Sequence, residues 1–221
     1  MSNWNDLSSA AQQKAQQIYQ ILLSFYGNPA GVSAMIGNIW HESGGTFDGR
    51  ILQGYYESDL DGYCQDYAED VNDGTISRYD FVHSNNPYGN GYGLCQWTDY
   101  GRKGGLYDYN LAGQYNDIAD NVMQLYYLDI ELQDNYYSPS LNAILTADEN
   151  TIDSATETIL LNFFAPLDPS ASLADRQQDA REVYNHCSGL PPIPPGPTPG
   201  FIDILILKHY IDKNHKRGYI I

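Results

Sequence analysis

Glu42 has the residue type and the setting that best suit catalysis in this sequence, because a single carboxyl group ends an apolar helical stretch. The apolar residues before it follow the i, i+3, i+4, i+7 and i+8 spacing of one helix face: Val32, Met35, Ile36, Ile39 and Trp40. The negative end of the helix dipole and desolvation by apolar neighbours would both raise the pKa of a carboxyl group. A carboxylic acid that stays protonated near neutral pH can protonate the leaving oxygen of a glycosidic bond. The alternative interpretation is a surface glutamate at a helix end.

Local signals define the helix that positions Glu42. Asn28 can cap its start, and Pro29 suits the first helical position. A Ser-Gly-Gly break follows Glu42, and Gly44 and Gly45 can take the left-handed conformation that closes a helix. We therefore expect Glu42 in the last turn.

A second candidate segment is the glycine-rich stretch 87–98, Pro-Tyr-Gly-Asn-Gly-Tyr-Gly-Leu-Cys-Gln-Trp-Thr. Its glycines permit a close backbone approach, Gln96 could hydrogen-bond a sugar hydroxyl or N-acetyl group, and Trp97 could stack on the sugar ring. The alternative is a glycine-rich turn that enters a core strand. The predicted sugar-binding residues are Gln96, Trp97, Tyr92, Tyr88 and Trp40.

Composition and charge limit the size of the domain and the kinds of partner that we expect. The chain has 221 residues, enough for one well-cored domain, and 20 tyrosines, which suit both sugar contact and ordinary packing. A net charge of −17 argues against nucleic acid or an anionic membrane as a partner. No apolar run is long enough to span a membrane. Residues 1–30 lack the pattern of a secretory signal peptide, so we expect any export to use another route.

Cysteine and histidine spacing gives no metal site, and we expect neither a metal nor a cofactor. Cys64, Cys95 and Cys187 show no metal-ligand spacing, and neither do His209 and His215. A Cys64–Cys95 disulfide is conceivable. Buried free thiols are an equally good interpretation.

Periodicity predicts a mainly helical chain with an irregular lobe. Further amphipathic stretches cover residues 6–26, 116–134, 138–146, 152–164 and 173–186. Residues 43–92 lose this period, and we expect loops, a short hairpin or two and one helix near Asp66 to Asn72. The predicted class is mainly α (α+β), with a helical domain, a small irregular or β lobe and a cleft between them.

Composition changes sharply after residue 188. Six of the 11 prolines lie between Leu190 and Gly200, which indicates an extended linker. Residues 201–221 hold four of the 11 basic residues. The predicted organisation is therefore a domain over 1–188, a linker over 189–200 and a short tail over 201–221.

Four segments in order resemble the phage tail lysozyme family, within the wider lysozyme, goose-type lysozyme and lytic transglycosylase superfamily. They are Ile18–Leu22, Gly37–Gly44, Gly91–Thr98 with Arg102, and Thr156–Pro166 with Arg176 and Ala180. The resemblance covers about residues 11–184 and implies a lysozyme-like fold. It also implies a role at the phage tail, in the virion or after release, with peptidoglycan as substrate and other tail proteins as possible partners. The tail 201–221 departs from the family pattern, since it is too short for a second enzymatic domain.

The resemblance implies that Glu42 is the general acid on the β-1,4 bond between peptidoglycan sugars, and that residues 93–96 match the superfamily's Gly-Leu-x-Gln motif. A hydrolase needs a second carboxylate, about 5–5.5 Å away if retaining or about 6.5–9.5 Å if inverting. Asp48, Asp59 and Asp61 are the candidates for this second carboxylate. Of these, Asp48 and Asp59 are the predicted catalytic residues beside Glu42. A lytic transglycosylase needs none, because the 6-hydroxyl of the substrate attacks. A non-catalytic tail-tip or wall-binding module is the alternative from another class.

Overall fold

Most of the described residues are helical, as the apolar periodicities of the chain predict. A computed structural model describes residues 3–83, 90–113 and 115–194. These form two compact units, each considered by itself: unit 1 contains the described residues up to 48 and from 128, and unit 2 those from 49 to 127. The mainly α class is confirmed. The predicted β lobe is not, since β pairing in the described part consists of isolated bridges from Tyr92 to Leu52 and Trp97.

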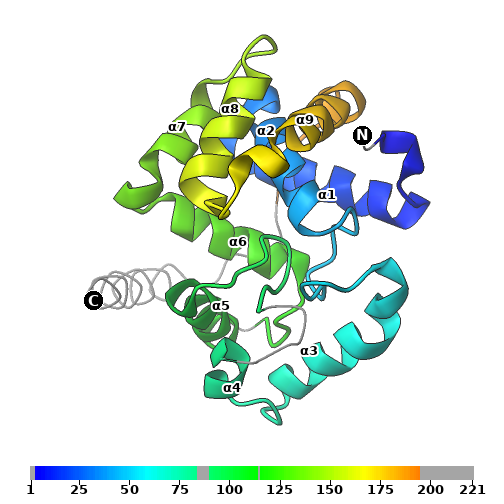
Figure 1. Ribbon diagram of the computed structural model, residues 1–221, viewed down its shortest axis with the longest axis vertical. Helices are drawn as coiled ribbons and strands as arrows, with labels where there is room; N and C mark the ends of the chain where they lie inside the picture. The colour runs from blue at the N-terminus through cyan, green and yellow to red at the C-terminus, as the bar shows by residue number, and fades with distance from the viewer. Residues whose placement is uncertain (1–2, 84–89, 114, 195–221) are drawn as a thin grey trace. The chain divides into compact units, whose positions relative to one another are not determined.

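Unit 1 is a helical bundle built around α2. Its elements are η1 (Trp4–Asp6), α1 (Ser9–Tyr26), α2 (Pro29–Glu42), η4 (Asn135–Tyr137), α7 (Ser138–Thr146), α8 (Ile152–Ile159), η5 (Leu160–Phe164), η6 (Pro169–Ala171) and α9 (Leu173–Cys187). Helices α1, α7, α8 and α9 all contact α2, and Figure 1 shows them grouped around it. Every residue from Ala30 to Trp40 is buried. The helix that carries Glu42 is therefore the centre of its unit.

The predicted limits of α2 are confirmed. The Asn28 side chain accepts hydrogen bonds from the backbone N–H groups of Ala30 and Gly31, at 3.0 and 3.2 Å, and so caps the first turn. After Glu42, Gly44 and Gly45 have φ angles of 58° and 79°, in the left-handed region that glycine adopts without strain. The chain can therefore turn sharply immediately after the carboxylate.

Gly37 lets α2 and α9 approach each other closely. A Cβ atom at this position would lie 2.6 Å from both the Ala180 nitrogen and the Arg176 carbonyl oxygen of α9. Both are backbone atoms, so no side-chain rotation can relieve the contact. The helices meet at a distance that only glycine permits, and this crossing brings the start of α9 to the end of α2.

We expect Gly37→Ala to destabilise the protein by about 2 kcal/mol or more, because the added methyl group forces α2 and α9 apart. Urea unfolding followed by circular dichroism measures the change. Gly189→Ala is the matched control, since a Cβ atom there meets nothing within 4 Å. Equal stability of the two variants would contradict the close approach.

Unit 2 contains shorter helices joined by long loops. They are η2 (Glu57–Asp59), the π-helical turn η3 (Leu60–Cys64), α3 (Gln65–Asn72), α4 (Arg78–His83), α5 (Tyr100–Ala112) and the first part of α6 (Asn121–Leu132), whose last residues belong to unit 1. The helix predicted near Asp66 is confirmed as α3. The sequence missed α4 and α5, and no predicted hairpin lies in the described part.

Apolar periodicity did not predict α5, because the sequence of this helix is rich in glycine. Gly101, Gly104 and Gly105 lower the helix propensity of its first half. At Gly105, a Cβ atom would lie 2.3 Å from the hydroxyl oxygen of Tyr127, which donates a hydrogen bond to the Arg102 carbonyl at 2.7 Å. The glycine is therefore required by packing, and tertiary contacts compensate for its low propensity.

Gln124 on α6 connects three loop segments of unit 2. Its side-chain oxygen accepts from the Leu94 backbone N–H at 2.9 Å, and its amide nitrogen donates to the carbonyls of Gly49 and Ile118, each at 2.8 Å. The side chain is fully buried. One buried amide thus adds to the few backbone hydrogen bonds between these segments, such as that from the Gly93 N–H to the Ile51 carbonyl at 2.8 Å.

Lys103 on α5 is a buried lysine. Its Nζ donates to the carbonyl and side-chain oxygens of Asn90, at 2.9 and 2.7 Å, and lies 4.6 Å from the centre of the Phe81 ring. Burial disfavours the charged ammonium and lowers the pKa of Lys103 from 10.5 to about 8.

We expect the stability of the native protein relative to a Lys103→Met variant to rise with pH between about 8 and 10.5, by about 3 kcal/mol in total. In this window the unfolded chain still binds the proton that the folded protein has released, so raising the pH favours the folded state. Below pH 8 the difference should be constant. Denaturant unfolding of both proteins across this range provides the measurement, and parallel stability curves would contradict the prediction.

The remaining predictions on organisation have mixed outcomes. Cys64, Cys95 and Cys187 are buried free thiols, so the conceivable Cys64–Cys95 disulfide does not form. The predicted linker starts against α1, where Gln20 donates to the Pro191 carbonyl at 2.9 Å and its own carbonyl accepts from the Ile193 N–H at 3.1 Å. Linker residues 195–200 and the tail 201–221 lie outside the described residues.

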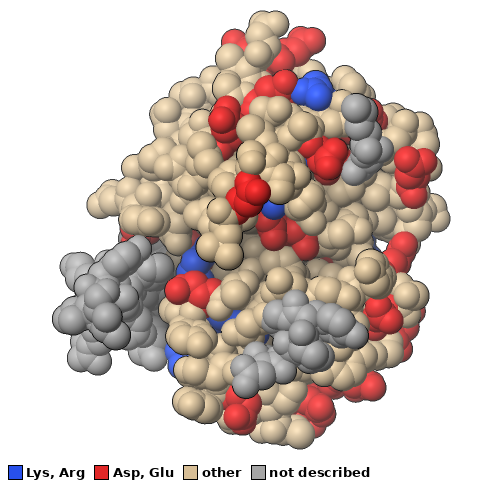
Figure 2. All heavy atoms as spheres, in the orientation of Figure 1, with Lys and Arg blue, Asp and Glu red and all other residues tan. Residues whose placement is uncertain are grey.

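The surface and the helices agree with two expectations from composition. Figure 2 shows acidic side chains over much of the face in view and few basic ones, in line with the net charge of −17. Among the described residues, no helix has the length and apolar character needed to cross a membrane.

Candidate active site

Glu42, the last residue of α2, is paired with a buried guanidinium. Its Oε1 accepts a hydrogen bond from Nη2 of Arg176, on α9, at 2.6 Å. The Arg176 side chain is only 3% exposed, whereas that of Glu42 is 19% exposed. The carboxylate therefore reaches solvent while its partner is held in the interior. The helix dipole and burial were predicted for Glu42 from the sequence, whereas the neighbouring Arg176 was not.

Other groups hold Arg176 in place. Its Nε donates to the Ser172 hydroxyl at 2.9 Å, and its Nη1 donates to the side-chain and carbonyl oxygens of Asn38 at 3.2 and 3.4 Å. The guanidinium also lies over the Phe164 ring, 5.7 Å from its centre. These contacts leave Nη2 directed at Glu42 and give the carboxylate a defined position.

Asn38 is fixed in turn by the bundle core. Its amide nitrogen donates to the carbonyl of Ala34, one turn earlier, and to that of Thr156 on α8, at 3.0 and 3.2 Å. These bonds orient its side-chain oxygen toward Arg176. Two neighbouring residues of α2 therefore have different roles: Gly37 permits the close crossing of α2 and α9, and Asn38 accepts hydrogen bonds from the guanidinium of Arg176.

Trp40 and His41, the two residues before Glu42, have different environments. Trp40 is 4% exposed and packs edge-on against Trp4 and Phe47, with ring centres 6.0 and 5.7 Å apart. Sugar stacking requires an open ring face, so this conformation gives Trp40 a packing role. Burial lowers the pKa of His41, and the nearby positive charge of Arg176 lowers it further, against an opposing effect of Asp175.

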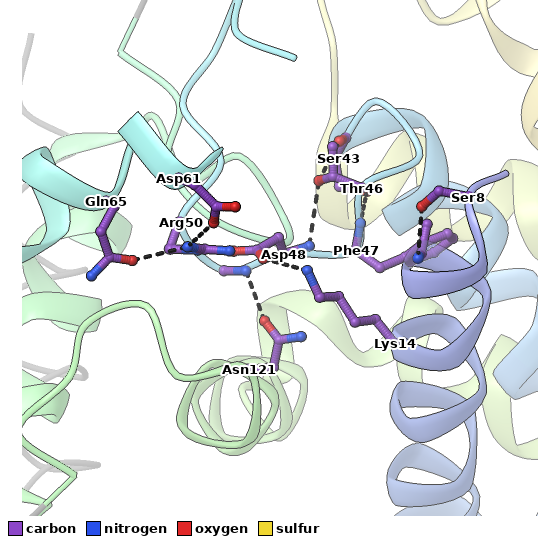
Figure 3. A network of polar contacts seen from close by, with 12 residues as sticks. Ser8, Lys14, Ser43, Thr46, Phe47, Asp48, Arg50, Asp61, Gln65 and Asn121 are labelled. Atoms are coloured by element: carbon purple, nitrogen blue, oxygen red, sulfur yellow. Dashed lines mark hydrogen bonds and ion pairs between the residues drawn. The ribbon is translucent and has the colours of Figure 1, made fainter. Parts of the chain in front are cut away.

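Asp48 belongs to the same unit as Glu42 and follows it after a tight turn. In this turn the Thr46 hydroxyl donates to the Ser43 carbonyl at 2.9 Å, and the Ser43 hydroxyl accepts from the Phe47 N–H at 3.2 Å. The Asp48 side chain is 8% exposed and accepts a hydrogen bond from Nζ of Lys14, on α1, at 2.5 Å, as Figure 3 shows. Asp48 is thus a buried carboxylate with its own cation.

Asp59 and Asp61 lie in unit 2 and have local partners there. The Asp59 side chain accepts from the Tyr56 backbone N–H at 2.8 Å and caps the turn η2. Asp61, whose side chain is 96% exposed, pairs with Arg50 at 3.0 Å (Figure 3). A capping carboxylate and a solvated ion pair are ordinary structural features.

The glycine-rich segment forms a packed turn in unit 2. The Gln96 amide nitrogen donates to the carbonyls of Gly93 and Ile51, at 3.0 and 3.3 Å. Tyr92 is fully buried, and Trp97 is 1% exposed with its ring 5.6 Å from that of Tyr127. In this conformation the segment is a turn whose aromatic rings pack in the core, so neither ring is presented for stacking, and within the described residues it enters no strand. Tyr88 lies outside the described residues.

The sequence analysis did not assign a role to Arg176, although a signal was present. The buried face of α9 reads Arg176, Asp179, Ala180, Val183 and Cys187. A buried arginine requires a partner, and Asp179 on the same face offers a carboxylate too, so the sequence did not single out Glu42. The position of Arg176 on the buried face of α9, more than its residue type, indicates that it needs a charged partner.

Comparison with known proteins supports the resemblance. The model of the phage tail lysozyme family matches residues 13–187. No curated protein and no solved structure matches the chain. The matched range includes α2, α9 and every element between them.

Proposed function

Because the chain belongs to the phage tail lysozyme family, we propose that it hydrolyses the β-1,4 glycosidic bonds of peptidoglycan with Glu42 as general acid. The family points to lysozyme-like degradation of peptidoglycan and to an association with phage. The observation that carries the assignment is the Glu42–Arg176 pair, in which a nearly buried guanidinium holds a partly exposed carboxylate. We also propose that the protein acts at the phage tail, to open the wall locally.

The pair gives the proposed general acid a fixed position beside a positive charge. A general acid becomes negatively charged as it gives its proton to the leaving oxygen. Arg176 is already placed 2.6 Å from Oε1, so it stabilises this charge without rearrangement. We assign the transferred proton to Oε2, since Oε1 is held by the guanidinium.

For the second carboxylate of a hydrolase, we propose Asp48. It shares unit 1 with Glu42 and forms an ion pair with Lys14. An ionised carboxylate is what a nucleophile or a general base requires. Asp59 and Asp61 are less suitable, because their contacts within unit 2 are those of a helix cap and a surface ion pair.

Digestion of purified peptidoglycan in ¹⁸O-labelled water, followed by mass spectrometry of the fragments, tests the reaction. A hydrolase produces reducing ends that contain the heavy oxygen. A lytic transglycosylase produces anhydro sugars without it, and that result would overturn the hydrolase proposal and the role of Asp48. Wall binding without any released fragment would support a non-catalytic module. Identifying the sugar at the reducing end of each fragment separates cleavage after muramic acid from cleavage after glucosamine.

A further inference from the structure

Unit 2 carries a row of three aromatic side chains on its surface. Tyr79 and His83 lie one turn apart on α4, and Tyr100 begins α5. The Tyr79 and His83 rings stack with centres 4.1 Å apart and planes 21° apart, and the His83 and Tyr100 rings are 4.7 Å and 34° apart. We call these three residues the aromatic row.

The aromatic row is exposed to an extent that packing does not explain. Tyr79 is 68% exposed and Tyr100 is 62% exposed. Since each tyrosine has one face against the imidazole, exposure on this scale includes the opposite face. Exposed rings in contact with one another offer faces on which a ligand can stack.

The contact between α4 and α5 has other supports. Phe81 is fully buried between the two helices and lies 5.7 Å from the Tyr107 ring. Arg78 donates to both carboxylate oxygens of Asp108, at 2.7 and 2.8 Å, in a bidentate pair. The aromatic row is therefore not needed to hold these helices together.

Hydrogen bonding and stacking give the row a defined geometry. His83 Nδ1 lies 2.8 Å from the Tyr79 carbonyl oxygen, which can only accept, so Nδ1 carries the proton. In the neutral ring Nε2 is then an acceptor. Because the three rings hold one another in place, a ligand that stacks on them immobilises few additional rotamers.

The ligand that suits these features is an uncharged sugar. Tyrosine faces and hydroxyl groups offer stacking and hydrogen bonds, and the His83 Nε2 offers an acceptor for a sugar hydroxyl. Both tyrosines have a carboxylate as a chain neighbour: Asp80 follows Tyr79, and Asp99, the cap of α5, precedes Tyr100. These carboxylates disfavour anionic ligands and can accept hydrogen bonds from hydroxyl groups.

We propose that the aromatic row binds the glycan strand of peptidoglycan, as a second contact that retains the protein on the wall. This inference rests on the proposed function for its choice of glycan. It assigns wall binding to residues that take no part in proton transfer by Glu42.

Sedimentation with purified peptidoglycan sacculi tests the inference in the full chain carrying Glu42→Gln, which should leave the wall undigested. We expect the added pair Tyr79→Ala and Tyr100→Ala to weaken binding about tenfold. Adding Tyr79→Phe and Tyr100→Phe should retain most of the binding, because the rings remain. Tyr136→Ala is the matched control, since Tyr136 is 64% exposed and lies in unit 1, on η4.

Unchanged binding after removal of both rings would overturn the inference, as would an equal loss in the Tyr136 control. A second measurement does not depend on the folding of the alanine variants. In NMR titrations of the Glu42→Gln protein with a chito-oligosaccharide, the His83 imidazole resonance should shift, and an unperturbed resonance would also overturn the inference. Failure of the proposed function has a different signature, namely soluble fragments released by the Glu42→Gln protein.

Discussion

The Glu42→Gln protein is expected to cleave peptidoglycan about a hundredfold to ten-thousandfold more slowly than the native protein while remaining folded. General acid catalysis typically contributes about 10²–10⁴-fold, and an amide cannot supply the proton. The substitution preserves the shape of the side chain and leaves an oxygen that can still accept from Arg176. Release of reducing ends from purified walls measures the rate, and thermal unfolding reports on the fold.

Glu182→Gln is a close control for this experiment. Glu182 lies on α9 in the same unit, and its side chain is 18% exposed, against 19% for Glu42. It accepts hydrogen bonds from the Trp4 N–H and the Gln178 amide, and its Oε2 lies 3.6 Å from His186 Nε2. We expect this variant to keep most of its activity. Substantial cleavage by the Glu42→Gln protein would show that another group provides the acid.

Loss of Arg176 should affect both catalysis and stability. We expect Arg176→Met to lower kcat about a hundredfold with little change in KM, because the guanidinium stabilises charge that develops on Glu42 during proton transfer. Stability should fall by about 3 kcal/mol, since Ser172, Asn38 and Glu42 all lose a hydrogen-bond donor. Steady-state kinetics and urea unfolding measure the two effects.

Two comparisons distinguish a positioning role for Arg176 from a purely structural one. In a double-mutant cycle, adding Arg176→Met to Glu42→Gln should cost little further activity, because the guanidinium acts through that carboxylate. Arg181→Met, on the same helix, removes an ion pair with Asp153 in which both side chains are more than two-fifths exposed. It should change stability by less than about 1 kcal/mol. Additive losses of activity in the cycle would refute the positioning role.

Much of unit 1 could be predicted from sequence because its helices follow local rules. The predicted limits of the stretch 138–146 coincide with α7, and those of 173–186 differ from α9 by one residue. The predicted helix 152–164 is observed as α8 followed by the π-helical turn η5. Apolar spacing, caps and prolines act within a few residues, so they can be read from the chain alone.

Unit 2 was harder to predict because tertiary contacts determine its structure. The side chain of Gln124 joins segments around residues 49, 94 and 118, which share no periodic pattern. The glycines of α5 suggest a loop, yet Gly105 is required by the nearby Tyr127 hydroxyl. Propensity is a weak guide where packing sets the requirement.

For the candidate sugar-binding residues too, tertiary contacts decided what the sequence could not predict. Tyr92 and Trp97 have side chains that suit a sugar site and a core equally well, and in the folded protein both are buried. Tyr79 and Tyr100 are instead among the exposed aromatic residues, and no sequence motif distinguishes them. Exposure is a property of the fold, so residue type alone could not separate the two groups.

The position of Glu42 at the end of a buried helix could be predicted, because Asn28, Pro29 and the glycines after Ser43 specify the limits of α2 through local backbone preferences. The group that pairs with its carboxylate depends on the tertiary structure. Arg176 is 134 residues away along the chain and reaches Glu42 because Gly37 lets α9 cross α2 at close range. Capping and helix period act over a few residues, whereas the electrostatic environment of a side chain depends on which distant segments pack against it.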